Sequence, residues 1–174
     1  MNKSKIEIGI LGGSFDPAHK GHLAISKEAR KRFKLKKIIW AITKKNPLKA
    51  VSKTPVSKRI KDCKKLIGSN TFIKVKFYED IINSNKTIDL INYLKKNRKL
   101  EIFFLMGADN LISFHKWHKS KLITEKCNII VFDRHGYKKN SLKSKTYKKL
   151  NNKTLTFVKF KKVNISSSQL RKIR

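Results

Sequence analysis

The fold is decided by residues 9–22, a glycine-rich stretch with the sequence GILGGSFDPAHKGH. It overlaps a mostly apolar, β-branched run from Ile6 to Leu11, which is typical of a buried strand. A helical pattern begins near Gly21. The stretch is therefore predicted to lead from a strand into a helix, which is where α/β folds bind phosphate groups.

The residue types of this turn suit an anion. Gly12 and Gly13 have no Cβ, so backbone N–H groups can approach a phosphate closely, and the following helix offers unpaired N–H groups and the positive end of its dipole. His19 and His22 are three residues apart, which places both imidazoles on one side of the first helical turn. Each feature alone has a simpler interpretation, a tight connection for the glycines and a metal half-site or surface position for the histidines. Their combination is more specific.

That combination resembles a known signature. The pattern Gly-Ser/Thr-Phe-Asp-Pro-x-His-x-Gly-His marks the nucleotidyltransferase superfamily with the His-x-Gly-His motif, and every position is matched. The resemblance implies that His19 and His22 contact the triphosphate of ATP. It also implies that the earlier residues of the turn bind ATP, namely Gly12, Gly13, Ser14 and Phe15.

Apolar, strand-like runs alternate along the chain with amphipathic, helix-like runs. The predicted strands cover residues 6–11, 37–43, 71–77, 101–106, 127–132 and 155–160, and the third suits an edge of the sheet. The predicted helices cover residues 21–33, 56–67 and 87–96, the last with Thr87 as its N-cap. Residues 136–154 are polar, and we expect them to be mobile. This alternation predicts an α/β fold with a doubly wound parallel sheet, Rossmann-like, in one domain over residues 1–174.

Ligands of such a sheet bind at the carboxyl ends of its strands. The unusual polar residues of this sequence fall there repeatedly, in the segments 12–22, 46–49, 107–109, 133–136 and 165–171. We therefore expect these segments to meet in one site.

Residues 165–171, with the sequence ISSSQLR, form the second strong motif. Its hydroxyl groups, helix N-terminal amides and guanidinium all suit phosphate oxygens, although by itself the segment is most simply a serine-capped terminal helix. Together with the first motif it resembles the Ile-Ser-Ser/Thr-x-x-Ile/Val-Arg motif that closes the active site in the same superfamily. The resemblance implies that Ser167 and Arg171 bind the triphosphate and that Ser166 is a further ATP-binding residue, while Leu170 departs from the usual Ile or Val.

The middle of the chain indicates which acceptor the site takes. Residues 105–111, LMGADNL, followed by HKWH at 115–118, look like the nicotinate-mononucleotide adenylyltransferase family. That family has a Trp that stacks on the pyridine ring, which implies this role for Trp117, and an indole face is the best aromatic partner for a pyridinium cation. A core position is the alternative for Trp117. His115 and His118 have no nearby carboxylate or cysteine to complete a metal site, so we assign no metal ligands.

The same resemblance assigns further residues. It implies that the adenosine binds near Gly107, Asp109 and Arg134. Thr87 is the expected donor to the nicotinate carboxylate. The family usually has Tyr-Thr where this chain has Lys86 and Thr87, and Arg-Pro-Gly where it has the Arg-His-Gly of residues 134–136.

Composition limits the alternatives. The 174 residues suffice for one domain with a sizeable core. Lys and Arg number 44 against 11 acidic residues, a net charge of +33, which makes a nucleic-acid-binding module the alternative of a different class. The Lys residues are spread over almost every predicted element without interleaved aromatics, so we expect no specific nucleic-acid partner. Cys63 and Cys127 lack metal spacing, and no run is long enough to span a membrane, which favours the cytoplasm.

The activity implied by the resemblance is transfer of the adenylyl group of ATP to nicotinate mononucleotide, which gives deamido-NAD and pyrophosphate. Mg²⁺ is the expected cofactor with ATP, and Lys49 is expected to join His19, His22 and Arg171 in offsetting charge. Phosphopantetheine adenylyltransferase shares the first and last motifs and is the second interpretation, but it is not expected to have the block from Asp109 to Trp117. The sequence does not determine the oligomeric state.

Overall fold

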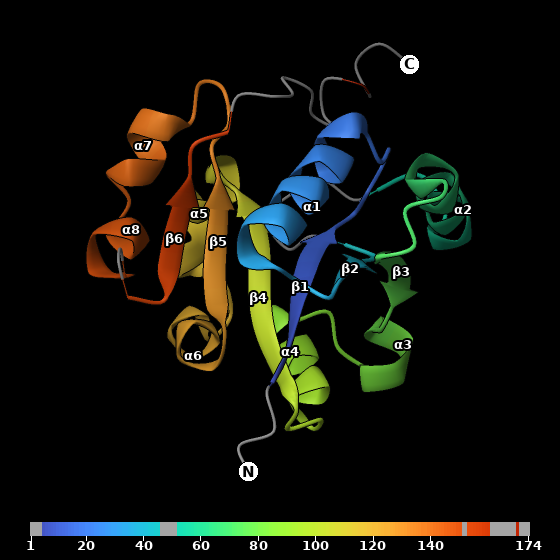
Figure 1. Cartoon of the computed structure of the whole chain (residues 1–174), viewed down its shortest axis with the longest axis horizontal. Helices are drawn as coiled ribbons and strands as arrows, with labels where there is room; N and C mark the ends of the chain where they lie inside the picture. The colour runs from blue at the N-terminus through green and yellow to red at the C-terminus, as the bar shows by residue number, and fades with distance from the viewer. Residues whose placement is uncertain (1–4, 46–51, 151–152, 161–169, 171–174) are drawn as a thin grey trace.

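The computed structural model of the chain describes residues 5–45, 52–150, 153–160 and 170. Six strands form one sheet in the order β3-β2-β1-β4-β5-β6, and every neighbouring pair is parallel. The strands are β1 (Ile6–Gly13), β2 (Lys37–Ile42), β3 (Ile73–Phe77), β4 (Leu100–Gly107), β5 (Asn128–Phe132) and β6 (Leu155–Val158). Figure 1 shows β3 and β6 at the two edges. The predicted doubly wound parallel sheet is confirmed, as is the edge position of the third strand.

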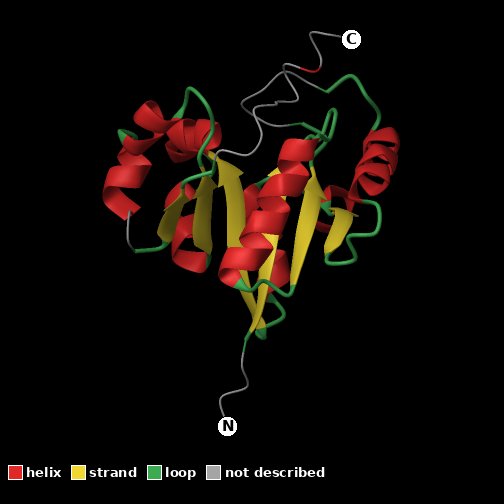
Figure 2. Ribbon diagram, turned by 45° about the horizontal axis from the view of Figure 1, so that its top comes forward, coloured by secondary structure: helices red, strands yellow, loops and turns green. Residues whose placement is uncertain are grey.

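Helices cover both faces of the sheet, as Figure 2 shows. One face packs against α1 (Lys20–Phe33) and α2 (Val56–Ile67). The other packs against α4 (Thr87–Lys95), α5 (Ala108–Ser113), the short 3₁₀ helix η1 (Phe114–Lys116), α6 (Ser120–Lys126) and α8 (Lys145–Leu150). Two further short helices, α3 (Glu79–Ile82) and α7 (Lys138–Leu142), lie in the connections.

The central strands are buried on both faces. Ile8 and Ile10 of β1 belong to the core under α4 and α5, while Leu11 belongs to the core under α1 and α2. This is the alternation of side chains expected along a strand. Trp40 of β2 is fully buried. Near-continuous apolar sequence in these strands is therefore explained by a helix layer on each side.

Two expectations about the connections were wrong. Residues 136–154 were expected to be mobile, but most of that range forms α7 and α8, which bury Ser141 and Thr146. Short helices with few apolar residues escape a periodicity argument. Thr87 was expected to be the N-cap of its helix, but Lys86 occupies that position and Thr87 is the first helical residue.

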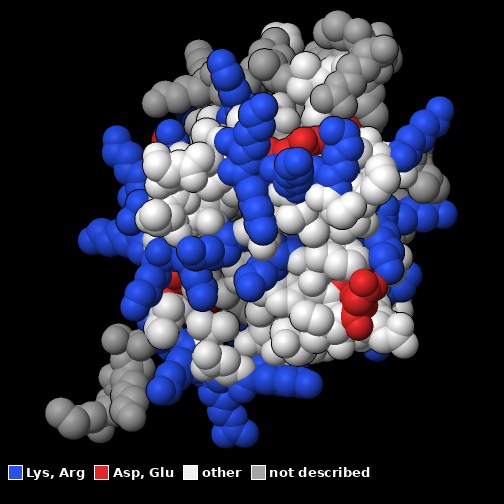
Figure 3. All heavy atoms as spheres, turned by 90° about the vertical axis from the view of Figure 1, so that its right-hand side faces the viewer, with Lys and Arg blue, Asp and Glu red and all other residues white. Residues whose placement is uncertain are grey.

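Basic side chains are widely distributed over the surface. Figure 3 shows Lys and Arg scattered across the face that carries α2 and β3, with few acidic groups between them. On this face the basic groups are not gathered into a single stripe (Figure 3). Among the described residues, no helix is both long and apolar enough to cross a membrane.

Candidate active site

The connectivity of the sheet reverses between β1 and β4. From β1 the chain continues to β2 and β3 on one side, and β4 begins the other half of the sheet. These two neighbouring strands end at Gly13 and Gly107, so the loops after them flank the crevice in which such sheets bind ligands. The predicted segments 12–22 and 107–109 thus meet at one place.

His19 and His22 fix the start of α1. His19 is the N-cap, and its Nδ1 accepts a hydrogen bond from the N–H of Gly21 at 3.1 Å. In turn, Nδ1 of His22 accepts a hydrogen bond from the N–H of His19, also at 3.1 Å. This reciprocal arrangement is a capping box built from imidazoles. The two rings lie side by side as predicted, with centroids 3.9 Å apart.

These hydrogen bonds determine what the two rings can offer a ligand. An Nδ1 that accepts a hydrogen bond carries no proton, so a neutral ring has its proton on Nε2. Burial, helped by the positive charge of Arg134, lowers the pKa of His19 from its ordinary value of 6.5 to about 4. His19 is therefore neutral at pH 7 and presents an Nε2–H donor that suits a phosphate oxygen.

Buried side chains support His22 from within the core. The ring of Phe15 stacks on Trp40, with centroids 5.0 Å apart, and its centroid is 4.7 Å from that of His22. The indole N–H of Trp40 donates to the Ser26 hydroxyl at 2.8 Å, and that hydroxyl donates to the carbonyl of His22 at 2.9 Å. Phe15 was predicted to bind ATP. Because its side chain is buried, that contact would come from its backbone.

A second predicted pair lies beyond the ends of β4 and β5. Arg134 Nη1 is 2.7 Å from Asp109 Oδ2, and both side chains are partly buried. A Cβ on Gly107 would lie 2.6 Å from Asp109 Oδ1, so the glycine keeps this space for the carboxylate. The charge of Arg134 also acts on His19. The ion pair therefore borders the loop of residues 12–22, which we call the phosphate loop after its predicted role.

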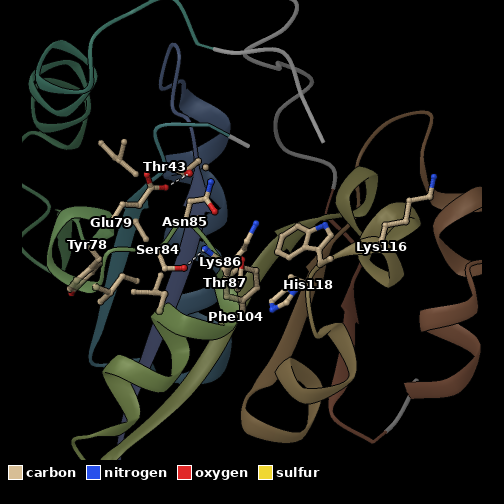
Figure 4. A pocket seen from close by; sticks show the side chains of 17 residues that line it. Thr43, Tyr78, Glu79, Ser84, Asn85, Lys86, Thr87, Phe104, Lys116 and His118 are labelled. Atoms are coloured by element: carbon tan, nitrogen blue, oxygen red, sulfur yellow. Dashed lines mark hydrogen bonds between the residues drawn. The ribbon is translucent and has the colours of Figure 1, made fainter. Parts of the chain in front are cut away.

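A cavity of about 320 Å³ opens beside the glycines of the phosphate loop. Its lining joins Gly12 and Gly13 to the two predicted acceptor residues, Thr87 and Trp117. Figure 4 shows Thr43, Glu79 and Ser84 on one side, with Lys116 extending away on the other. The remaining described site residues lie outside this lining, namely Ser14, Phe15, His19, His22, Gly107, Asp109 and Arg134.

Trp117 lies between the core and the cavity. It follows η1 and is partly buried, with its ring edge-on to Phe104 at a centroid distance of 5.9 Å and tilted against Phe114 at 5.2 Å. It also lines the cavity. One part of the indole therefore packs against the core while another part faces the cavity.

Sequence reasoning missed the part of the cavity wall that α3 contributes. Glu79 accepts a hydrogen bond from the hydroxyl of Thr43 and another from the backbone N–H of Lys44 at 3.1 Å. These bonds tie α3 to the end of β2. No motif indicated this contact, because Thr43 and Glu79 lie 36 residues apart.

The turn before α4 forms the next part of the wall. The Ser84 hydroxyl donates to the Asp89 carboxylate at 2.6 Å and accepts the N–H of Lys86 at 3.1 Å. Ser84, Asn85 and Lys86 all line the cavity. The available signal was the Ser/Asn-rich composition of this turn, which predicted a connection but not a binding wall.

Four predicted residues, Lys49, Ser166, Ser167 and Arg171, lie outside the described residues and stay predictions. Within the described ranges, no cluster of three or more His, Cys, Asp or Glu side chains could hold a metal ion. Cys63 and Cys127 are buried free thiols, and burial raises the pKa of each to about 12. They are therefore inert packing residues and not nucleophiles.

Known proteins resemble this chain at the level of family, sequence and fold. The cytidylyltransferase-like family model matches residues 10–173. A probable nicotinate-nucleotide adenylyltransferase from Pelagibacter ubique (strain HTCC1062) is 67% identical over 173 residues, covering 99% of this chain and 96% of the relative. A probable enzyme of the same name from Agrobacterium fabrum is 38% identical over 131 residues, covering 74% and 70%.

Solved structures share the fold at low sequence identity. Nicotinic acid mononucleotide adenylyltransferase from Plasmodium falciparum, complexed with NaAD, has a TM-score of 0.79 at 22% identity and covers 95% of this chain and 82% of that one. A putative nicotinate-nucleotide adenylyltransferase from Vibrio parahaemolyticus has a TM-score of 0.60 at 19% identity, covering 72% of each chain. Because the family model spans nearly the whole chain and the Pelagibacter relative is 67% identical over almost its full length, this chain belongs to the nicotinate-nucleotide adenylyltransferase family of cytidylyltransferase-like proteins.

Proposed function

We propose that this protein transfers the adenylyl group of ATP to nicotinate mononucleotide, releasing pyrophosphate and forming deamido-NAD. The observation that carries the proposal is the junction of two features. The phosphate loop with His19 and His22 shares Gly12 and Gly13 with a cavity that Trp117 and Thr87 line. A nucleotide triphosphate and a mononucleotide acceptor would therefore lie next to each other.

The reaction needs little from the protein beyond positioning and charge stabilisation. The phosphate of the acceptor is already an anion at neutral pH, so no general base is required. It attacks the α-phosphorus of ATP in line, a new phosphoanhydride bond forms, and pyrophosphate leaves. The Nε2–H groups of His19 and His22 are the described donors to the triphosphate, because Nδ1 of each ring is already an acceptor in the capping box.

Four residues outside the described ranges complete the proposed ATP site. Lys49, Ser166, Ser167 and Arg171 are assigned to it on the strength of their motifs. The Asp109 and Arg134 pair is assigned to the adenosine, because it borders the phosphate loop on the side of β4 and β5.

The acceptor occupies the cavity in this proposal. The indole of Trp117 stacks on the pyridinium ring, which is the arrangement that a delocalised cation favours. The hydroxyl of Thr87 and the first amides of α4 face the nicotinate carboxylate. Thr87 suits this role because it is the first residue of the helix, where backbone N–H groups have no partner within the helix.

Mg²⁺ is proposed to enter with ATP. The described residues offer the triphosphate N–H donors and hold no cluster of carboxylates that would form a protein cage for the ion, and magnesium is commonly bound largely through substrate phosphates and water. When bound, the ion neutralises charge on the phosphate oxygens. The residues of this chain then orient the phosphates through His19 and His22.

Pyrophosphate release tests the proposal directly. The protein is incubated with Mg-ATP and, in separate reactions, with nicotinate mononucleotide, nicotinamide mononucleotide or phosphopantetheine. We expect pyrophosphate and deamido-NAD in equal amounts with the first acceptor. Turnover with phosphopantetheine and none with either pyridine mononucleotide would overturn the assignment.

A further inference from the structure

Arg59 is a buried cation that the proposed chemistry does not use. It lies in the first turns of α2 and is 2% exposed. Its Nη1 donates to the backbone carbonyls of Ser14 at 2.7 Å and Thr43 at 2.8 Å, and its Nε donates to the carbonyl of Thr54 at 2.9 Å. One guanidinium therefore holds three separate backbone segments.

Two of these segments are the two halves of the site. Ser14 belongs to the phosphate loop, five residues before His19. Thr43 follows β2, lines the acceptor cavity and donates its hydroxyl to Glu79. The backbone N–H of Thr43 also donates to the carbonyl of Gly13 at 3.0 Å. Arg59 is thus bonded to the loop proposed to hold ATP and to the wall proposed to hold the acceptor.

The surroundings of Arg59 are arranged to keep a charge there. The Asp16 side chain is 4% exposed, lies close enough to attract the guanidinium, and accepts a hydrogen bond from the Ser52 hydroxyl at 2.5 Å. Burial lowers the pKa of Arg59, and the attraction of Asp16 opposes this shift. A buried charge is expensive unless it is paired and hydrogen-bonded, so a purely structural contact could be made more cheaply by apolar packing.

The arrangement also requires arginine in particular. The planar guanidinium offers five N–H groups in a fixed fork, which lets it bond carbonyls in several directions at once. A lysine ammonium at the same place keeps the charge but is a point donor on a flexible stem. It could not hold all three carbonyls in the same geometry.

We infer that Arg59 is a positioning residue that sets the distance between the phosphate loop and the acceptor wall. It touches neither substrate, and the inference rests on the proposed adenylyl transfer. In-line transfer requires the acceptor phosphate to meet the α-phosphorus in a narrow range of positions, and a shift of about 1 Å can cost roughly 10²-fold in rate. Each substrate alone would still find its own binding surface.

The test compares Arg59→Lys and Arg59→Met with the matched control Cys63→Ala. Cys63 lies one turn further along α2 and is fully buried, so its truncation weakens the packing of this helix without removing a bond to either loop. Single-turnover rates are measured with enzyme in excess, Michaelis constants are measured for both substrates, and circular dichroism identifies a temperature at which every variant is folded.

We expect the single-turnover rate of Arg59→Lys to fall by about 10- to 100-fold, with both Michaelis constants within about threefold of wild type. Cys63→Ala should lower the unfolding temperature but keep the rate. Equal rates for Arg59→Lys and the control would overturn the inference, as would a loss confined to one Michaelis constant. If Arg59→Met does not fold, the single-turnover rate of Arg59→Lys alone tests the positioning role. Failure of the wild-type protein to use nicotinate mononucleotide is a separate result, which concerns the proposed function.

Discussion

The phosphate loop and the acceptor cavity lie side by side but are built in different ways. The loop is one contiguous stretch, and the histidine capping box that begins α1 is formed entirely within it. The cavity wall is assembled from β2, α3, the turn before α4 and the residues after η1. The histidine end of the loop is therefore pre-organised by local sequence, whereas the cavity depends on contacts between distant segments.

The largest loss of turnover should come from substituting a histidine of the phosphate loop. His22→Ala removes an Nε2–H donor and the acceptor of the His19 N–H bond, so turnover should fall by roughly 10²-fold or more, the range seen when a charge-stabilising donor is lost. The measurement is the rate at saturating ATP. His115→Ala is the control, because it removes an exposed imidazole that lies outside the cavity lining. Near-normal turnover of His22→Ala would remove this loop from the triphosphate.

This contrast also explains what could be predicted from the sequence. His19, His22 and the glycines lie in one motif, and the strands and helices follow from alternating patterns, so the strand-to-helix turn and the parallel α/β sheet were predicted correctly. The Thr43 and Glu79 bond joins residues that no sequence pattern relates. The guanidinium of Arg59 donates to three backbone carbonyls, which come together only in the completed fold. Contacts that require tertiary structure to form were the ones missed.

Substitution of Trp117 should have a smaller effect, on the affinity for the acceptor. If the indole stacks on the pyridinium, Trp117→Ala should weaken the binding of nicotinate mononucleotide by about 1–2 kcal/mol. This corresponds to a loss of roughly five- to thirty-fold in affinity. The Michaelis constant for ATP should change little. Because the ring also contacts Phe104 and Phe114, the unfolding temperature should fall as well. The measurement pairs thermal unfolding with both Michaelis constants.

Trp117→Phe separates the two contributions of the indole. The smaller ring keeps part of the packing against Phe104 and is a weaker partner for a cation. We therefore expect a stability close to wild type with an intermediate constant for the mononucleotide. An Ala variant that loses stability while keeping the constant would assign Trp117 to the core alone.

The lowered pKa of His19 predicts how stability varies with pH. The unfolded chain takes up a proton near the ordinary value of 6.5 and the folded chain only near 4, so between these values the unfolded state binds more protons. This contribution to stability is therefore complete above about 6.5 and is lost as the pH falls towards 4. Urea unfolding of the wild type and of His19→Asn at several pH values measures it.

Asparagine is the matched replacement because it caps helices well and does not titrate in this range. The variant should lose less stability than the wild type between pH 6.5 and 4. An identical pH dependence in the two proteins would show that the imidazole of His19 titrates normally. The same logic predicts that His19 stays neutral, and keeps its donor, throughout the pH range near 7.

The smallest effect should come from Lys86, where the chain departs from the Tyr-Thr pair usual in the family. Its side chain is exposed and lines the cavity next to Thr87. Nicotinate carries a carboxylate that nicotinamide lacks, so a nearby ammonium should favour nicotinate mononucleotide. An exposed ion pair contributes at most about 1 kcal/mol, so Lys86→Tyr should shift the preference between the two mononucleotides by no more than about fivefold.

Ionic strength decides whether that shift comes from charge. Attraction between exposed charges is screened at high salt, so the preference of the wild type should approach that of Lys86→Tyr as salt is added. Lys126→Tyr is the control, because Lys126 ends α6 and does not line the cavity. A preference that persists in high salt would place discrimination with Thr87 and the first amides of α4. The acceptor site would then be as pre-organised as the phosphate loop, despite its assembly from distant segments.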